Sequence, residues 1–304
     1  MQRQPILVGV DASAEAAAAA EFGSNLAHAA GVRCQLVHAV RDPWAAALLA
    51  EMPDQTPEFT RALYQQARVQ LRQLLEGRVP PEALQELVVQ AGRPDEVIAS
   101  MVTETHAALI VLGGKHHSVL GRWFGGSTSL NVARTSAVPV LVTAGAPAAM
   151  RRVLVALDSS DAARPTLDAA RHYARVLGAE LRILSVIEPL PVMPESAPMV
   201  DATPYYDLCR STIDAELRPL VETSGGELIV RIGPTVSTIE DEATSWRADL
   251  VVVGSHGKTW TQRLMLGSVT ERLLNHLPTS LVVVPVSVRQ PVAEPAPALV
   301  PALS

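Results

Sequence analysis

The sequence predicts an α/β fold of two tandem Rossmann-like domains, each with a five-stranded parallel sheet and helices on both faces. At 304 residues, the chain has the length of two average domains. In each half, short apolar runs alternate with longer stretches of helical character, a pattern typical of parallel sheets. The strand candidates are continuous runs of Val, Ile and Leu, as expected when helices bury both sheet faces.

The second half of the chain repeats the first. Three glycine pairs keep one spacing of 141 residues: Gly92 and Gly233, Gly113 and Gly254, and Gly126 and Gly267. The N-terminal strand motif at Ile6 recurs at Val153, 147 residues later. The first half therefore carries about six extra residues, placed either in the loop after its second strand or near Pro80 and Pro81.

The elements follow in order from this pattern. First-half strands are expected near 5–10, 32–40, 86–91, 107–112 and 138–143. Second-half strands are expected near 152–157, 181–187, 227–232, 249–254 and 280–286, with helices near 161–177, 205–223, 235–247 and 268–276. The predicted domains are 1–147 and 148–288, followed by a flexible tail at 289–304 that is rich in proline.

Composition excludes several classes of function. A net charge of −6 without a basic block argues against nucleic-acid binding. The two cysteines, Cys34 and Cys209, lie one in each half and predict neither a disulfide framework nor a metal cluster. Apolar runs are strand-sized and no signal-peptide pattern is present, so we expect a cytoplasmic protein without a membrane span.

The strongest functional signal follows the apolar strand ending at Val253. Gly254, Gly257, Gly267 and Ser268 form the pattern G-x2-G-x9-G-S. Glycine lets backbone N–H groups turn onto a phosphate, and the helix opened by Ser268 offers further N–H groups at its N-terminus. The pattern predicts a phosphate-binding loop, with a nucleotide as the leading ligand.

A second signal converges on the same place. Doubly wound sheets bind ligands beyond the carboxyl ends of the strands, where the winding direction reverses. Asp158 ends the first strand of the second half, and Gly254 ends the fourth. If the strand order is 3-2-1-4-5, these strands are neighbours, and the acid meets the glycine loop.

These residues resemble the universal stress protein family in its tandem form, and its nucleotide-binding branch in particular. Gly254, Gly257, Gly267 and Ser268 match that family's motif G-x2-G-x9-G-(S/T). The resemblance implies the sheet order 3-2-1-4-5 in each half and ATP bound at the strand ends. ADP and AMP are alternative ligands, and Mg²⁺ or Mn²⁺ is a possible companion of the phosphates, without assigned metal ligands.

The same resemblance implies a role for each residue of the second-half site. Asp158 would hold the adenosine portion, Val186 would meet adenine through its backbone, and the glycine loop with Ser268 and Val269 would hold the phosphates. His256, within the loop, is a further candidate for contact with a phosphate or a metal. The simpler alternatives are an N-cap or turn residue for Asp158 and a solvent-exposed loop side chain for His256.

The first copy departs from the motif, because His116 stands where the second glycine is expected. If that position needs a positive φ, a residue with a Cβ costs roughly 1–2 kcal/mol there. Nucleotide binding in the first half is therefore open, against a vestigial site. The candidate residues are Asp11, Ala39, Gly113, His116, Gly126 and Ser127.

We predict a nucleotide-dependent sensor or regulatory module. The loop positions phosphates, but no second acid is anchored near it by sequence, and no catalytic residue is assigned. Enzymatic activity is uncertain and at most that of a weak ATPase. A third alternative is an interaction protein in which the nucleotide is only a stabilising ligand.

The last strand of each half would lie at a sheet edge under the implied strand order. Apolar edge strands invite pairing. We therefore expect the two halves to pair within the chain; a homodimer of whole chains and regulatory protein partners are left open.

Overall fold

The computed structural model describes residues 4–40, 56–114, 128–145, 150–190, 201–222, 225–257, 266–276 and 279–286. The first half contains β1 (Ile6–Gly9), α1 (Ala14–Ala30), β2 (Cys34–Val40), α3 (Thr56–Leu75), α4 (Pro81–Gln85), β3 (Val88–Ala91), α5 (Pro94–Thr105), β4 (Leu109–Gly114), α6 (Thr128–Thr135) and β5 (Val140–Ala144). The second half contains β6 (Arg152–Ala156), α7 (Ala163–Leu177), β7 (Glu180–Ile187), α8 (Thr203–Glu222), β8 (Glu227–Ile232), α9 (Thr235–Ser245), β9 (Leu250–Gly254), α10 (Ser268–His276) and β10 (Ser280–Val284).

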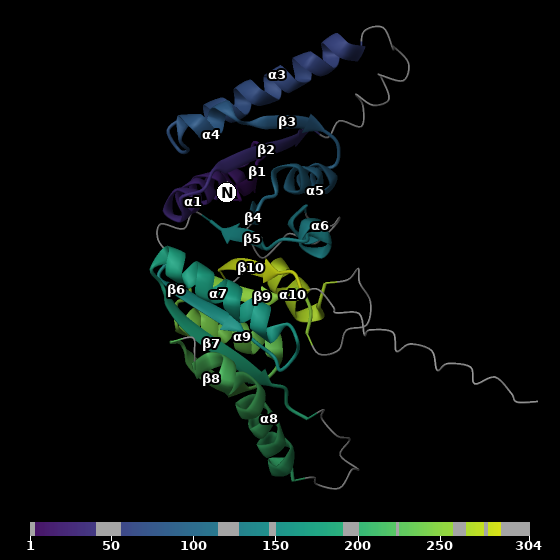
Figure 1. Ribbon diagram of the computed structural model, residues 1–304. Coiled ribbons are helices and arrows are strands. Elements are labelled where there is room, and N and C mark those ends of the chain that lie inside the picture. Colours follow the sequence, from purple (N-terminus) through teal and green to yellow (C-terminus); the bar gives the residue numbers. More distant parts are fainter. Residues whose placement is uncertain are drawn as a thin grey trace, which may run out of the picture.

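All strands of the described residues join one ten-stranded sheet (Figure 1). Its order is β3-β2-β1-β4-β5-β10-β9-β6-β7-β8, so each half has the order 3-2-1-4-5 that the family resemblance implies. Neighbouring strands within a half are parallel. The predicted α/β fold with two tandem parallel sheets is confirmed.

The two halves meet where their last strands pair. β5 and β10 run antiparallel, with Leu141 opposite Val282. Ser280 Oγ accepts a hydrogen bond of 3.1 Å from Ala144 N at one end of this seam. On the helices above it, Arg134 of α6 forms an ion pair of 2.9 Å with Glu271 of α10. The expected pairing of the two halves within the chain is therefore present.

Side chains of the central strands alternate between two hydrophobic clusters, one on each sheet face. Leu154 is fully buried on the face covered by α9 and α10, while its neighbours Val153 and Val155 are fully buried under α7. This alternation follows from the pleat of a strand, whose successive side chains point to opposite faces. Each such side chain contributes about 1.5–3 kcal/mol of burial free energy. Continuous apolar strands are therefore required here.

Two boundaries refine the sequence predictions. The extra first-half residues lie near Pro80 and Pro81, where the short helix α4 separates α3 from β3, while β8 follows α8 almost directly. The helix expected from residue 161 begins later, at Ala163. No helix among the described residues is long and apolar enough to cross a membrane. The predicted tail, 289–304, lies outside the described residues.

Candidate functional site

A cavity of about 380 Å³ lies at the carboxyl ends of the second-half strands. This volume falls within the range of roughly 300–1,000 Å³ found for small-molecule sites. All eight second-half residues singled out from the sequence line it: Asp158, Val186, Gly254, His256, Gly257, Gly267, Ser268 and Val269. The structure thus brings together residues that lie far apart in the chain.

Asp158 follows β6 and points its half-buried carboxylate at the glycine loop. One oxygen, Oδ1, accepts a hydrogen bond of 2.5 Å from Ser160 Oγ. The other, Oδ2, faces Gly257 so closely that a Cβ added to the glycine would lie 2.5 Å from it. The N-cap of α7 is Ala162, without a side-chain cap. Asp158 therefore does not cap this helix, and Gly257 is small because the carboxylate occupies the space beside it.

Hydrogen bonds fix both ends of the glycine loop against the sheet. Gly254 O accepts from Thr270 Oγ1 at 2.8 Å, and Ser255 O accepts from Gly267 N at 2.8 Å. Ser255 N donates to the Val284 carbonyl oxygen of β10 at 2.8 Å. These bonds hold the start of α10 beside the end of β9, where its first N–H groups lack intrahelical partners and favour an anion.

His256 is half-buried and lines the cavity. Its Nδ1 lies 2.8 Å from Ser255 Oγ, and Ser255 Oγ also accepts from Val286 N at 3.0 Å. The Ser255 hydroxyl can donate to Nδ1 or accept from it, because a hydroxyl oxygen has two acceptor lone pairs. Where Nδ1 accepts, the ring proton of a neutral His256 is on Nε2, which can then donate to a ligand.

An apolar wall completes the other end of the cavity. Leu184 and Val186 of β7 and Ile239 of α9 line it together with Val253 of β9. Val186 is half-buried and packs against the cluster under α9 and α10. Small-molecule sites are typically lined by apolar side chains with a few placed polar groups, and this cavity has that composition.

Four polar lining residues were missed from the sequence: Thr166, Glu188, Thr235 and Thr270. Glu188 corrects the expectation that no second acid lies near the loop. Its Oε1 accepts a hydrogen bond of 2.6 Å from Thr235 Oγ1, which ties the end of β7 to the start of α9. Glu188 could have been predicted as a lining residue from its position, because it lies two residues after Val186 at the carboxyl end of a strand. Thr166 belongs to helix α7, and no local sequence pattern indicates that it lines a cavity.

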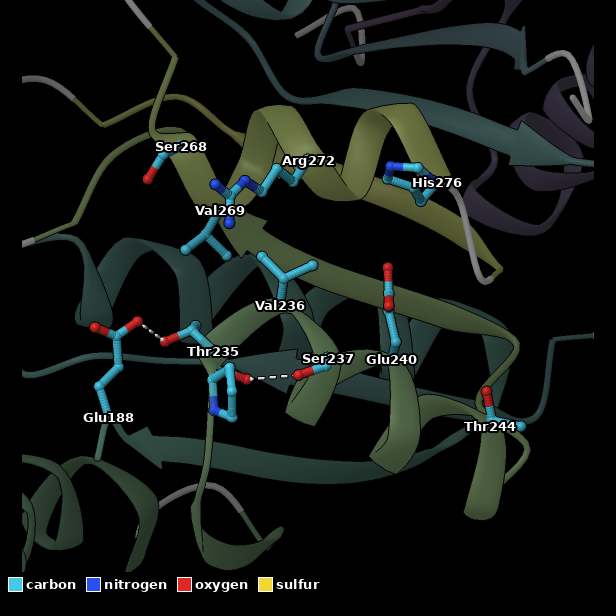
Figure 2. Close-up of a pocket in the computed structure, with 11 residues that line it drawn as sticks. Glu188, Thr235, Val236, Ser237, Glu240, Thr244, Ser268, Val269, Arg272 and His276 are labelled. Atoms are coloured by element: carbon cyan, nitrogen blue, oxygen red, sulfur yellow. Dashed lines mark hydrogen bonds between the residues drawn. The ribbon is translucent and has the colours of Figure 1, made fainter. Parts of the chain in front are cut away.

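A wider groove of about 700 Å³ adjoins this cavity between α9 and α10 (Figure 2). Glu188, Thr235, Ser268 and Val269 line both spaces. In Figure 2, the Arg272 side chain runs along α10 toward Ser268 and Val269. The cavity is therefore open on this side.

The corresponding first-half cavity is much smaller, about 110 Å³. Asp11, Ala39 and Gly113 line it, whereas His116, Gly126 and Ser127 lie outside the described residues. A Cβ added to Gly113 would lie 2.7 Å from the backbone C and O atoms of Glu15. The first turn of α1 thus lies directly on the end of β4.

The two copies also differ in helix capping at this place. Ser13 Oγ caps α1 by accepting from Ala16 N at 3.1 Å, so the helix starts at Ala14. Its counterpart Ser160 accepts from Ala162 N instead, at 3.2 Å, and α7 starts only at Ala163. The second half therefore keeps open the space that the first turn of α1 fills in the first half.

Comparison with known proteins identifies the family. The model of the universal stress protein family matches residues 2–144 and again residues 150–285. The chain belongs to the universal stress protein family. A universal stress protein of Mycolicibacterium smegmatis is 27% identical over 296 residues, covering 92% of this chain and 96% of the relative. Universal stress protein Rv2005c of Mycobacterium tuberculosis is 26% identical and covers 89% of this chain and 93% of the relative.

Solved structures of the family share the tandem fold. The crystal structure of a universal stress protein from Archaeoglobus fulgidus matches with a TM-score of 0.59 at 20% identity. The match covers 94% of this chain and 99% of the other. In the part of the present chain that the structure describes, no group of three or more His, Cys, Asp or Glu side chains is arranged to hold a metal ion.

Proposed function

We propose that this universal stress protein binds ATP in its second half and acts as a nucleotide-dependent sensor or regulatory module in the cytoplasm. The single observation that carries the proposal is the convergence of Asp158 and the glycine loop on one cavity of about 380 Å³. We assign the site to a domain of residues 148–288. The domain of residues 1–147 would act as its partner in the shared sheet.

The cavity suits the parts of ATP separately. The apolar wall of Leu184, Val186 and Ile239 suits adenine, and the Asp158 carboxylate suits the hydroxyl groups of ribose. Gly257 and the start of α10 at Ser268 suit the phosphates, because backbone N–H groups there favour negative charge. Mg²⁺ or Mn²⁺ would enter with the phosphates, which supply most of its ligands in such sites.

We propose binding rather than rapid turnover. Fast phosphoryl transfer needs a fixed metal and an oriented nucleophile beside the terminal phosphate. Glu188, the second acid of the cavity, is hydrogen-bonded to Thr235 at the start of α9. In this arrangement the acid supports the wall of the site, and any hydrolysis would be slow.

Calorimetric titration with ATP tests the proposal, with two matched acid variants. Asp158→Asn keeps the shape of the side chain but removes its charge, and we expect at least about a tenfold loss of affinity from the weakened hydrogen bonds. Asp11→Asn makes the same change in the first half and is expected to leave the affinity unchanged. Equal effects of both variants, or no binding by the wild type, would refute the proposal.

A further inference from the structure

Thr166 has a buried hydroxyl group that the fold itself does not satisfy. The residue lies in the first turn of α7, is 1% exposed and lines the cavity. Its Oγ1 has no hydrogen-bond partner among the described residues. Buried hydroxyl groups nearly always have a partner, because an unsatisfied one destabilises the fold. This atom therefore requires an explanation.

Other helical threonines of the chain satisfy themselves locally. Thr103, Thr105, Thr135 and Thr212 each donate to the carbonyl oxygen four residues earlier, at 2.7–3.1 Å. Thr166 has the same option, since the Ala162 carbonyl accepts its backbone N–H at 3.1 Å. A threonine in a helix can adopt a rotamer that makes this bond. Thr166 instead turns its hydroxyl away from the helix.

The hydroxyl lies beside the first glycine of the loop. Thr166 Oγ1 lies 3.1 Å from the position of a Cβ built on Gly254, the first glycine of the loop. On the opposite side of this strand end, Thr270 donates its hydroxyl to Gly254 O at 2.8 Å. Two threonines thus flank one glycine. Thr270 is satisfied by the backbone, and Thr166 is not.

The threonine at this place of the repeat occurs only in the second half, which has the larger cavity. With the spacing of 147 residues between the two copies, the counterpart of Thr166 is Ala19, which is fully buried and carries no polar group. A hydroxyl group is therefore present where the cavity is about 380 Å³ and absent where it is about 110 Å³. A purely structural role in the repeat would not require this difference.

We propose that Thr166 is a further ligand of the nucleotide, and that its hydroxyl donates a hydrogen bond to an oxygen of the bound phosphate chain. This inference rests on the proposed function and adds a side-chain donor to the backbone groups of the glycine loop. A hydrogen bond to a charged oxygen is stronger than one to a neutral group.

The variant Thr166→Val tests the inference, because valine keeps the shape of threonine and removes only the hydrogen-bonding group. We expect the affinity for ATP and ADP to fall about ten- to hundredfold. The affinity for adenosine, which has no phosphate, is expected to stay within about twofold of the wild type. Without ligand, the melting temperature of Thr166→Val should equal or exceed that of the wild type, since an unsatisfied buried group is removed.

Two further variants sharpen the test. Thr166→Ser retains the hydroxyl and should bind ATP far more tightly than Thr166→Val. Thr103→Val removes a hydroxyl from an exposed helical threonine of the first half and should leave ATP affinity unchanged. The inference is overturned if wild type and Thr166→Val bind ATP equally, or if adenosine binding falls as much as ATP binding. If the wild type binds no nucleotide at all, the proposed function fails first.

Discussion

The Cα of Gly257 lies against the carboxylate of Asp158, with no room for a side chain between them. A Cβ on the glycine would approach Asp158 Oδ2 to 2.5 Å, closer than real Cβ contacts. The acid comes from the end of β6 and the glycine from the loop after β9. Their contact joins the two sequence signals that predicted the site, and it makes the loop sensitive to the smallest possible substitution.

Gly257→Ala is therefore expected to weaken ATP binding by about tenfold or more, because the added methyl group must displace the Asp158 carboxylate or the loop. Calorimetry with ATP measures the loss. A suitable control is Gly178→Ala at the end of α7, where a Cβ meets nothing within 4 Å but the φ of 62° remains unfavourable. The control should lower the melting temperature yet keep the affinity; similar affinity loss in both variants would contradict the account.

His116→Gly restores the family motif in the first half, yet we expect it to leave the stoichiometry at one ATP per chain. The first turn of α1 packs on Gly113, and the first-half cavity measures only about 110 Å³, too little for a nucleotide by the usual size of such sites. Titration of the variant with ATP gives the number of sites directly. A second site in His116→Gly would show that the missing glycine, rather than α1, closes the first half.

The ion pair between Arg134 and Glu271 is expected to contribute little to the seam between the two halves. Both side chains are about one-third exposed, at 34% and 38%, so water screens their attraction. A double-mutant cycle of Arg134→Ala and Glu271→Ala, measured by urea unfolding, should give a coupling of about 0.2–1 kcal/mol. The paired strands β5 and β10 would then carry the association. A coupling above about 3 kcal/mol would identify a dominant buried pair instead.

Cys34 is expected to react slowly with iodoacetamide in the folded protein. Burial raises the pKa of its thiol above the ordinary value of 9.0, an effect that the hydrogen bond from Ser24 Oγ partly offsets. Only the thiolate is nucleophilic, so labelling of Cys209→Ser at pH 8 should be much slower when folded than in urea. Equal rates in the two states would contradict this expectation.

The raised pKa of the Cys34 thiol also makes the stability of the fold depend on pH. Because the folded pKa is raised, the contribution of Cys34 is fully present below its unfolded pKa and is lost as pH rises through the folded pKa. Urea midpoints should therefore fall more steeply above pH 9 in the wild type than in Cys34→Ala. If the urea midpoints of both proteins fall equally with pH, groups other than Cys34 cause the loss of stability at alkaline pH.

Much of this fold follows from local sequence. Runs such as Leu250–Gly254 are apolar throughout because both faces of a central strand are buried, and this burial fixed their positions within a residue or two. The start of α7 was less predictable. Ser13 and Ser160 occupy equivalent places, but one caps a helix and the other closes a turn, a choice that depends on the backbone geometry of each copy.

The candidate site also contains residues that the sequence predicts and residues that it does not. Glycine spacing revealed the loop, because only glycine tolerates the contact that Gly257 makes with Asp158. Thr166 and Glu188 stayed hidden, since a threonine in a helix and an acid after a strand are common on surfaces. Their place in the cavity depends on how α7 and β7 pack against distant elements, which local sequence does not encode.

The most direct test of the central claim is to denature the purified protein and quantify the adenine nucleotide it releases, together with the thermal shift caused by added ATP. We expect up to one nucleotide per chain as purified and a saturable stabilisation by ATP that Asp158→Asn removes. Release of no nucleotide, combined with no thermal shift at millimolar ATP, would contradict nucleotide binding and leave an interaction protein as the function of the chain.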